Sequence, residues 1–556
     1  MKVDLAAGFE PGSREEWRAL ALAVLRKSGY EGDDPEGRLA TRTYDGVTIA
    51  PLYDEAPDLP RLVGNAGPWD VRQRHAHPDP RVTREAILAD LENGVSSVWL
   101  DLTSLDPATL PVALDGVLLD LAPVVLDAGK RAAQAAHTFL QLNETAFQLN
   151  GSGEFPGGNL GFAPDDPDLA DFAGRARGRL RLVVVDALAY HDGGAADAQE
   201  LAASITQGVR ALRRLTEAGV STERAFELIE FRYAATADQF LTIAKLRAAR
   251  RLWARVAEVA GGPPEQLQHA VTSGAMMTAR DPWVNMLRTT LACFAAGAGG
   301  ADAVTVQPFD AALGLPDAFA RRIARNTQSL LVEEAGIARV ADPAGGSWYV
   351  EHLTDDLANT AWDLFQQTEK HGEQVLTDAI AGARAARAKD VARRRHPITG
   401  VSEFPNLTEK VPAREAGPGL PGQPDRYAGP FEKLRDLADA QDDRPTVFLA
   451  TIGPVAVHTA RATFAANLFA AGGIATVVGE PAEFVHAGTT VACICSSDRL
   501  YADHAEQVAA ALREAGAEKV WLAGKGEYGG VDATLFAGCD ALKVLESTFD
   551  DLGVDR

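Results

Sequence analysis

The feature that most constrains the fold is an alternation of short apolar runs with longer helical stretches, from about residue 66 to residue 395. This alternation is typical of parallel sheets, because each parallel strand needs a crossover to reach the next one. Eight runs qualify as strands, which favours an α/β fold of the (β/α)8 TIM-barrel type. The runs are 98–102, 117–121, 138–142, 182–186, 228–231, 268–272, 303–306 and 337–340. We expect the Gly-, Pro- and Asp-rich stretch 149–168 to be a loop at the C-terminal end of a strand, where barrels place their chemistry.

The stretch 319–353 is interpreted as the unit that closes this barrel. Pro316-Asp317 predicts the start of a helix that Gly336 ends. Residues 337–340 then form a short buried strand, and a turn at 342–346 places Trp348 and Tyr349 at its C-terminal end. Thr354-Asp-Asp356 opens the next helix, since acidic side chains suit a first helical turn.

The composition changes after the barrel. Residues 396–445 are rich in Pro and Gly and predict a long linker that wraps the surface. Short apolar runs return within 446–556, at 446–450, 475–478, 490–495, 519–523 and 541–545. Five such runs with intervening helices indicate a doubly wound, flavodoxin-like domain. It contains neither a G-x-G-x-x-G fingerprint nor a Walker A loop, so a nucleotide role has little support.

The segment 1–65 precedes the barrel and is interpreted as an N-terminal arm. Ser13 and Glu16 form a capping-box pattern that opens a helix ending at Gly29. The helix carries an apolar stripe made of Trp17, Leu20, Val24 and Leu25. An isolated arm cannot bury such a stripe, so we expect it to pack on a partner subunit or across the barrel.

Charge and cysteine content narrow the class of protein. With 54 basic and 77 acidic residues the net charge is −23, which argues against nucleic acid or an anionic membrane as the partner. Four cysteines in 556 residues indicate a reducing compartment rather than a disulfide framework. The chain has no signal-peptide or membrane-spanning pattern, so we expect it to be cytoplasmic.

Three runs carry a resemblance to a known family. They are Arg322-Ile-Ala-Arg-Asn-Thr-Gln328, Asp342-Pro-x-x-Gly-Ser-x-Tyr-Val-Glu351, and Lys245-Leu-Arg-Ala-Ala-Arg250 with Leu252-Trp-Ala254, where the x in the second run marks positions outside the pattern. In these runs the chain resembles the methylmalonyl-CoA mutase family, the adenosylcobalamin-dependent acyl-CoA mutases. The likeness covers most of the chain and implies a TIM-like barrel followed by a cobalamin-binding, flavodoxin-like domain.

The resemblance also implies an Asp-x-His-x-x-Gly motif after the first strand of the C-terminal domain. The His would be the lower axial ligand of cobalt, with the Asp holding its other ring nitrogen. The three positions are Val455, Val457 and Ala460 in this chain. A valine has no lone pair to donate. His458 is one residue away and would point about 100° from the ligand direction on a helix.

The barrel motifs of the family are also altered. The tyrosine of the family's Arg-Gln-Tyr-Ala-Gly motif is replaced by Arg74. In the run from His269 to Ala275, the family's Gln and Trp have become Val271 and Ala275. The family's Gly-Thr-Ile-Gln-Asn-Asp run has no clear counterpart in 140–160. His191, which follows a tyrosine, matches the family's active-site histidine, although the loop after it is about two residues shorter.

Three other clusters have structural interpretations that we favour over functional ones. His75 and His77 could pair on a metal, but their context suggests exposed loop residues. Arg393-Arg-Arg395-His396 could bind phosphate, but at a helix end it suits the helix dipole and the linker. The helix 245–253 could touch a CoA chain, but its apolar face favours packing in the barrel.

The losses fall on groups that would bind cobalt, cofactor and acyl chain, whereas the scaffold motifs persist. The resemblance therefore implies a catalytically silent small (beta) subunit beside a large catalytic (alpha) subunit that binds adenosylcobalamin. On this hypothesis the complex interconverts (R)-methylmalonyl-CoA and succinyl-CoA, and this chain has no catalytic, cofactor-binding or metal residue. Two alternatives stay open, a divergent acyl-CoA isomerase and an acyl-CoA-sensing protein without cobalamin. A stable larger partner distinguishes the first hypothesis from both.

Overall fold

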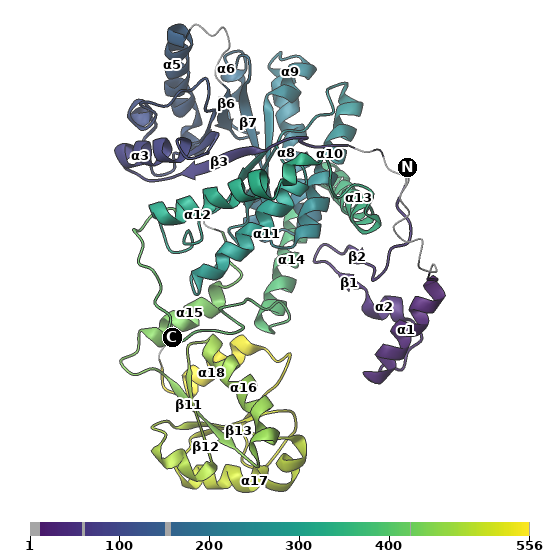
Figure 1. Ribbon diagram of the computed structural model, residues 1–556, viewed down its shortest axis with the longest axis vertical. Helices are drawn as coiled ribbons and strands as arrows, with labels where there is room; N and C mark the ends of the chain where they lie inside the picture. The colour runs from purple at the N-terminus through teal and green to yellow at the C-terminus, as the bar shows by residue number, and fades with distance from the viewer. Residues whose placement is uncertain (1–11, 58–59, 61, 151–156, 423, 555–556) are drawn as a thin grey trace.

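A computed structural model describes residues 12–57, 60, 62–150, 157–422 and 424–554. Its centre is a closed barrel of eight parallel strands in the order β10-β3-β4-β5-β6-β7-β8-β9 (Figure 1). The strands are β3 (Asp70–His75), β4 (Ser97–Asp101), β5 (Val124–Asp127), β6 (Gly158–Phe162), β7 (Leu180–Asp186), β8 (Ile229–Ala235), β9 (Gln268–Thr272) and β10 (Ala303–Thr305). The predicted α/β barrel is thus confirmed.

Five of the eight predicted strands lie on β4, β7, β8, β9 and β10, and the other three were wrong. Residues 138–142 belong to α5 (Ala132–Asn150), where Ala136, Phe139 and Leu140 are buried at helical i, i+3 and i, i+4 spacing. Residues 117–121 form turns in which Leu118 and Leu121 are exposed. Residues 337–340 lie at the short 3-10 helix η5 (Ile337–Arg339).

The barrel strands that the sequence pattern missed are β3, β5 and β6. β3 reads Asp-Val-Arg-Gln-Arg-His and is nonetheless buried along nearly its whole length, because its charged side chains pair inside the barrel. β6 occupies part of the predicted loop 149–168, of which residues 151–156 lie outside the described structure. Hydrophobic alternation alone does not reveal a strand such as β3, whereas β5 is a short apolar run, Val-Val-Leu-Asp, that was overlooked.

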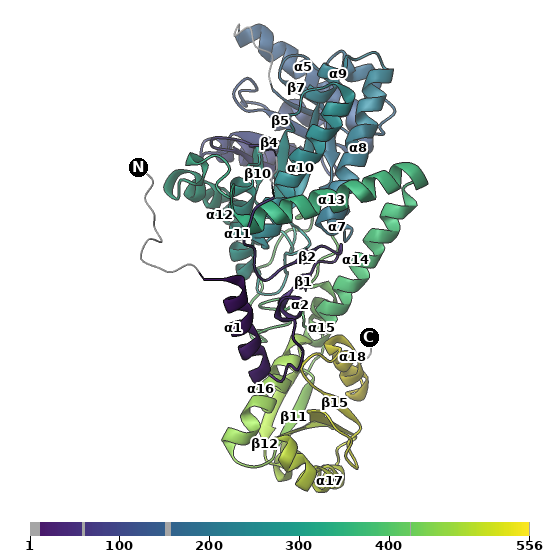
Figure 2. The same cartoon turned by 90° about the vertical axis from the view of Figure 1, so that its right-hand side faces the viewer.

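Helices cover the outside of the barrel. They include α3 (Pro80–Leu91), α8 (Asp197–Glu217), α10 (Gln239–Ala260), α11 (Asn285–Ala298) and α12 (Ala318–Ser329). α13 (Trp348–His371) lies across α8 and α10, and α14 (Gln374–Ala392) then runs toward the C-terminal part of the chain (Figure 2). The predicted helix start at Asp317 is confirmed, since its carboxylate caps α12. The predicted start at 354–356 was wrong, because these residues lie inside α13, which begins at Trp348.

The family-like run in α12 has a structural explanation. The guanidinium of Arg325 forms a buried ion pair with Asp90 of α3. The side-chain oxygen of Gln328 accepts a hydrogen bond of 3.0 Å from the indole of Trp69. These polar side chains therefore fasten α12 to the barrel.

The C-terminal part contains a five-stranded parallel sheet in the order β12-β11-β13-β14-β15. Its strands are β11 (Thr446–Thr451), β12 (Ala475–Gly479), β13 (Val491–Cys495), β14 (Lys519–Ala523) and β15 (Ala533–Leu535). This is the flavodoxin-like strand order, as predicted. The fifth predicted strand, 541–545, was wrong: Asp540 caps α18 (Ala541–Asp551) at that point.

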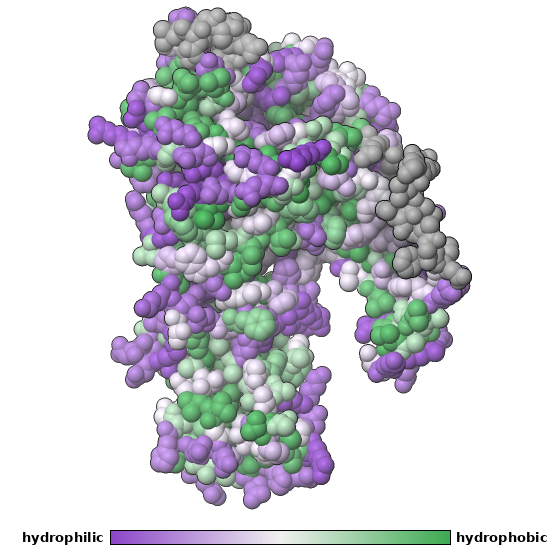
Figure 3. All heavy atoms as spheres, viewed as in Figure 1, coloured by the Kyte–Doolittle hydropathy of each residue, from purple (hydrophilic) through white to green (hydrophobic). Residues whose placement is uncertain are grey.

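The N-terminal segment divides into two parts. α1 (Arg14–Lys27) has the predicted capping box, yet none of its residues is buried. β1 (Thr41–Arg42) and β2 (Thr48–Ile49) form a hairpin that lies on the barrel, where Asp45 accepts a 2.7 Å hydrogen bond from the amide of Ala198. Figure 3 shows the end of the arm standing apart from the C-terminal unit.

No helix in the described ranges is both long and apolar enough to cross a membrane.

Candidate functional site

Charged side chains fill the barrel axis at the N-terminal ends of the strands. Near the N-terminal end, Arg72 forms an ion pair with Glu230 and lies 3.2 Å from Asp70. The second carboxylate oxygen of Glu230 accepts a 3.2 Å hydrogen bond from Asn159. The barrel itself therefore supplies the partners of Arg72, Glu230 and Asn159.

The middle of the axis is closed by Trp99. Its indole ring is fully buried among Leu188, Ala234 and Val271. The guanidinium carbon of Arg232 lies 4.0 Å from the ring centroid, a close cation–π contact. Arg232 in turn lies 2.9 Å from Asp186 and 3.0 Å from Asp127. Val271, which replaces the family's glutamine, is part of this apolar plug.

Arg74, at the family's tyrosine position, closes the upper layer. It lies 2.5 Å from Asp101 on β4. Its other terminal nitrogen donates to the carbonyl oxygens of Gly419 at 2.8 Å and Pro418 at 3.2 Å. Through these contacts Arg74 holds the linker residues Pro418 and Gly419 over the barrel.

Residues 418–427 form a strap across the C-terminal mouth, with residue 423 outside the described structure. Leu420 packs against Met277 and Ala311, and the amide of Tyr427 donates to the carbonyl of Ala275 at 2.9 Å. A Cβ on Gly274 would lie 2.6 Å from Pro424, so the strap meets the loop after β9 directly. Ala275, the family's tryptophan position, is therefore covered.

His191 lies beneath this strap, on α7 (Leu188–Asp192). Its Nε2 lies 2.7 Å from the hydroxyl of Ser273, and its Nδ1 lies 3.7 Å from Glu200. Burial, followed by the positive charge of Lys245, lowers the pKa of His191 to about 3. His191 is thus a neutral, buried group within the protein.

The helix α10 contributes a buried cluster that periodicity did not reveal. Lys245 lies 2.6 Å from Glu200 and 2.9 Å from Asp197. Arg250 donates to Gln268 at 2.7 Å and to the carbonyl of Gly299 at 2.7 Å. The interpretation of this helix as barrel packing agrees with these contacts, but ion pairs and hydrogen bonds carry much of that packing.

The expectation that His75 and His77 are exposed loop residues was wrong for His75, which is buried in β3. Burial, then the charges of Arg321 and Arg74, lower the pKa of His75 to about 3. Its Nε2 lies 3.6 Å from Asp90, and that of His77 lies 3.6 Å from Glu415, so the two rings face different partners. Across the described ranges, no group of three or more His, Cys, Asp or Glu side chains could hold a metal ion.

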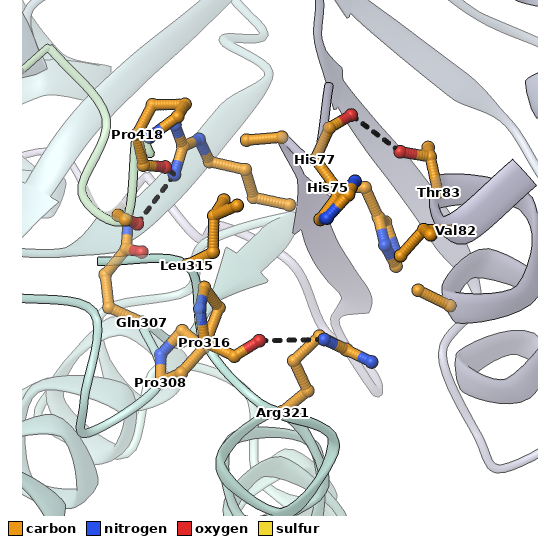
Figure 4. A pocket seen from close by; sticks show the side chains of 14 residues that line it. His75, His77, Val82, Thr83, Gln307, Pro308, Leu315, Pro316, Arg321 and Pro418 are labelled. Carbon is orange, nitrogen blue, oxygen red and sulfur yellow. Dashed lines mark hydrogen bonds between the residues drawn. The ribbon is translucent and has the colours of Figure 1, made fainter. Parts of the chain in front are cut away.

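A small pocket of about 50 Å³ lies beside these histidines. Figure 4 shows its two walls, with His75, His77, Val82 and Thr83 opposite Gln307, Leu315, Pro316 and Pro418. Arg321 donates to the carbonyl of Pro316 at 2.9 Å and borders the pocket. The pocket is at the rim between β3 and β10, and Arg74, which pairs with Asp101 in the upper layer of the barrel, is one of its lining residues.

The positions that would ligate cobalt lie on the first turns of α16 (Val455–Ala471). Val455 is 71% exposed, and Val457 offers only an aliphatic side chain. The Nδ1 atom of His458 is buried and has no hydrogen-bond partner in the described structure, so no carboxylate orients the ring through this nitrogen. An axial imidazole requires such an orienting partner. The residues present do not fit adenosylcobalamin.

The fold and this region define an α/β-barrel protein with a flavodoxin-like unit at its C-terminal end. Residues 167–437 match the family model described as methylmalonyl-CoA mutase. The chain is 53% identical to the methylmalonyl-CoA mutase small subunit of Streptomyces virginiae, across 99% of this chain and 98% of that protein. It is 38% identical to the small subunit of Propionibacterium freudenreichii subsp. shermanii, across 100% and 97%. The chain belongs to the methylmalonyl-CoA mutase family.

A large subunit also resembles the chain, at a greater distance. The methylmalonyl-CoA mutase large subunit of Streptomyces virginiae is 28% identical, across 79% of this chain and 68% of that protein. The two kinds of subunit thus share related sequences, while the full-length similarity of this chain is to the small subunits.

Proposed function

We propose that this chain is the non-catalytic small subunit of an adenosylcobalamin-dependent methylmalonyl-CoA mutase. Two observations together support this proposal: the barrel axis is filled by side chains, and the cobalt-ligating histidine is missing. Trp99 and Arg232 fill the axis, and Val457 stands where the axial histidine would be. Close similarity to proteins named small subunits supports the same conclusion.

On this proposal the large subunit holds adenosylcobalamin and carries out the interconversion of (R)-methylmalonyl-CoA and succinyl-CoA. Radical chemistry needs a cavity in which substrate and cofactor are held to within about an ångström. In the described part of the barrel, Trp99 and Arg232 fill the middle of the axis, where such a cavity would have to lie. The chain alone is therefore inactive and contributes neither catalytic nor cofactor-binding residues.

We divide the chain into an arm (1–65), a barrel domain (66–395), a wrapping linker (396–445) and a C-terminal domain (446–556). The arm supplies part of the interface with the large subunit. Leu20 and Val24 of α1 are 70% and 63% exposed, and a helix that buries none of its residues gains little from its own chain. Burial of this apolar stripe against the partner would stabilise the helix α1.

The test is co-expression of this chain with the large-subunit chain of the same organism, followed by affinity purification and mutase assay. We expect the two chains to co-purify in equal amounts and the complex to turn over, whereas this chain alone shows no turnover. Turnover by this chain alone, or no association with the large chain, would contradict the proposal.

A further inference from the structure

A second pocket lies where the end of α14 meets the C-terminal unit. It has a volume of about 110 Å³, and its walls come from three separate segments. Arg393, Arg394 and Glu403 lie on one side, with Phe464 and Leu468 of α16 and residues 536–541 on the others. The arginines belong to the run 393–396, for which phosphate binding was the less favoured interpretation.

Arg394 is the unusual residue of this pocket. Its backbone has a φ of +56°, a conformation that few residues other than glycine adopt. Its side chain is only 9% exposed and lies against Phe464, with the guanidinium carbon 5.7 Å from the ring centroid. One terminal nitrogen lies 2.5 Å from Glu403. Nε and Nη1 have no hydrogen-bond partner in the described part of the chain.

Buried guanidinium N–H groups are costly when unpaired, so this arrangement calls for an acceptor. The wall of the pocket supplies one carboxylate for two guanidinium groups. That carboxylate, Glu403, is shared, because its second oxygen accepts a 2.8 Å hydrogen bond from Asn467. The nearby Asp540 caps α18 by accepting from the amide of Lys543. Among the residues that line the pocket, Arg393 and Arg394 are cationic and only Glu403 is anionic, and two N–H groups of Arg394 lack an acceptor in the described structure.

We propose that this pocket binds one phosphate group, held by Arg394 with Arg393 at its edge. Phosphate oxygens accept hydrogen bonds from guanidinium groups in well-defined geometry. A pocket of about 110 Å³ has room for a single tetrahedral oxyanion but not for a nucleotide. The bound group would join the last barrel helix to the C-terminal unit. The proposal does not depend on the catalytic role of the chain.

The experiment is isothermal titration of the full chain, in complex with its large subunit, with inorganic phosphate and separately with glycerol 3-phosphate. Potassium chloride keeps the ionic strength constant. We expect one site per complex with millimolar or tighter affinity, and the stronger of the two ligands identifies the free ion or the monoester as the source. No saturable heat, or heat that chloride reproduces, would mean that water fills the pocket and would overturn the proposal.

Two variants and a matched control locate the site. R394M should weaken phosphate binding at least tenfold. R395M changes the neighbouring arginine, whose side chain is 61% exposed and lies 3.7 Å from Asp390, and should leave binding unchanged. Equal losses in both variants would contradict the site.

The variant Glu403→Gln tests the proposal independently if R394M does not fold. This change removes the competing negative charge but keeps hydrogen-bonding groups for Arg394 and Asn467. We expect phosphate to bind several-fold more tightly than to the unaltered protein. Weaker or unchanged binding in Glu403→Gln would overturn the proposal.

Discussion

The ammonium nitrogen of Lys245 lies 2.6 Å from a carboxylate oxygen of Glu200, and neither side chain has any exposure. Burial raises the pKa of Glu200 to about 7, although the charge of Lys245 opposes this shift. The pair links α10 to α8 on the outside of the plugged barrel. Its stability depends on both partners, because each charge is expensive to bury alone.

Replacing Lys245 with Met should therefore destabilise the barrel by about 3 kcal/mol. This is the low end of the range for breaking a buried pair, because Glu200 can take up a proton at neutral pH. Urea unfolding followed by fluorescence measures the loss. The double variant K245M/E200Q should recover part of it, and a double variant no more stable than K245M would contradict this account of the pair.

The raised pKa of Asp192 predicts that the free energy of unfolding falls as the pH rises, whereas a carboxylate with a lowered pKa has the opposite effect. Burial, then the neighbouring charges of Asp186 and Glu200, raises its pKa to about 8. The folded state therefore holds a proton that the unfolded state has released above about pH 4. The contribution of Asp192 to the free energy of unfolding falls as pH rises from about 4 to 8, by up to about 1.4 kcal/mol per unit.

Asp192→Asn removes this dependence while keeping the shape of the side chain. The free energy of unfolding of the variant, relative to the unaltered protein, should rise between pH 5 and pH 8 and level off above that. Unfolding measured at several pH values checks the slope. Parallel curves for the two proteins would show that Asp192 is ionised in the folded state.

His191→Ala should leave the turnover of the assembled mutase almost unchanged, since His191 faces Ser273 beneath the strap. Assembly is checked in parallel by native mass spectrometry. A fall in kcat of more than about tenfold, or about 1.4 kcal/mol in the barrier, in a fully assembled complex would place the working active site in this barrel.

The stripe on α1 should contribute to association with the large subunit. Changing Leu20 and Val24 to Asp should weaken association at least tenfold, because charges would replace apolar surface. The same two charges at Ala19 and Ala23, exposed residues outside the stripe, provide the matched control. Deleting residues 1–40 should also weaken association while the C-terminal unit stays folded. Sedimentation with the large subunit measures each affinity, and equal effects of the stripe and control variants would place the interface elsewhere.

The sequence was sufficient for the fold class and for strands that contain an apolar run, such as β7 and β13. It was insufficient where charged residues are buried by pairing. β3 reads as polar because Arg72 and Arg74 face the axis, where Glu230 and Asp101 neutralise them. The strap was predicted only as a wrapping linker, since its place over the mouth depends on backbone contacts such as that between Tyr427 and Ala275.

The substitutions at Arg74 and Val271 were visible in the sequence as differences from the family. The filling of the barrel axis could not be predicted from these substitutions, because it also requires Trp99 and Arg232 to meet across the barrel. Two residues 133 positions apart carry no local signal of such contact. His75 was misplaced for a related reason, since its strand was not recognised.

The most direct test of a silent subunit is the cobalamin content of the complex. Both chains are purified together, saturated with adenosylcobalamin, freed of unbound cofactor and analysed by absorbance against protein concentration. We expect one cobalamin per pair of chains, with none retained by this chain alone. Two cobalamins per pair, or a histidine-ligated cobalamin spectrum from the isolated chain, would contradict it.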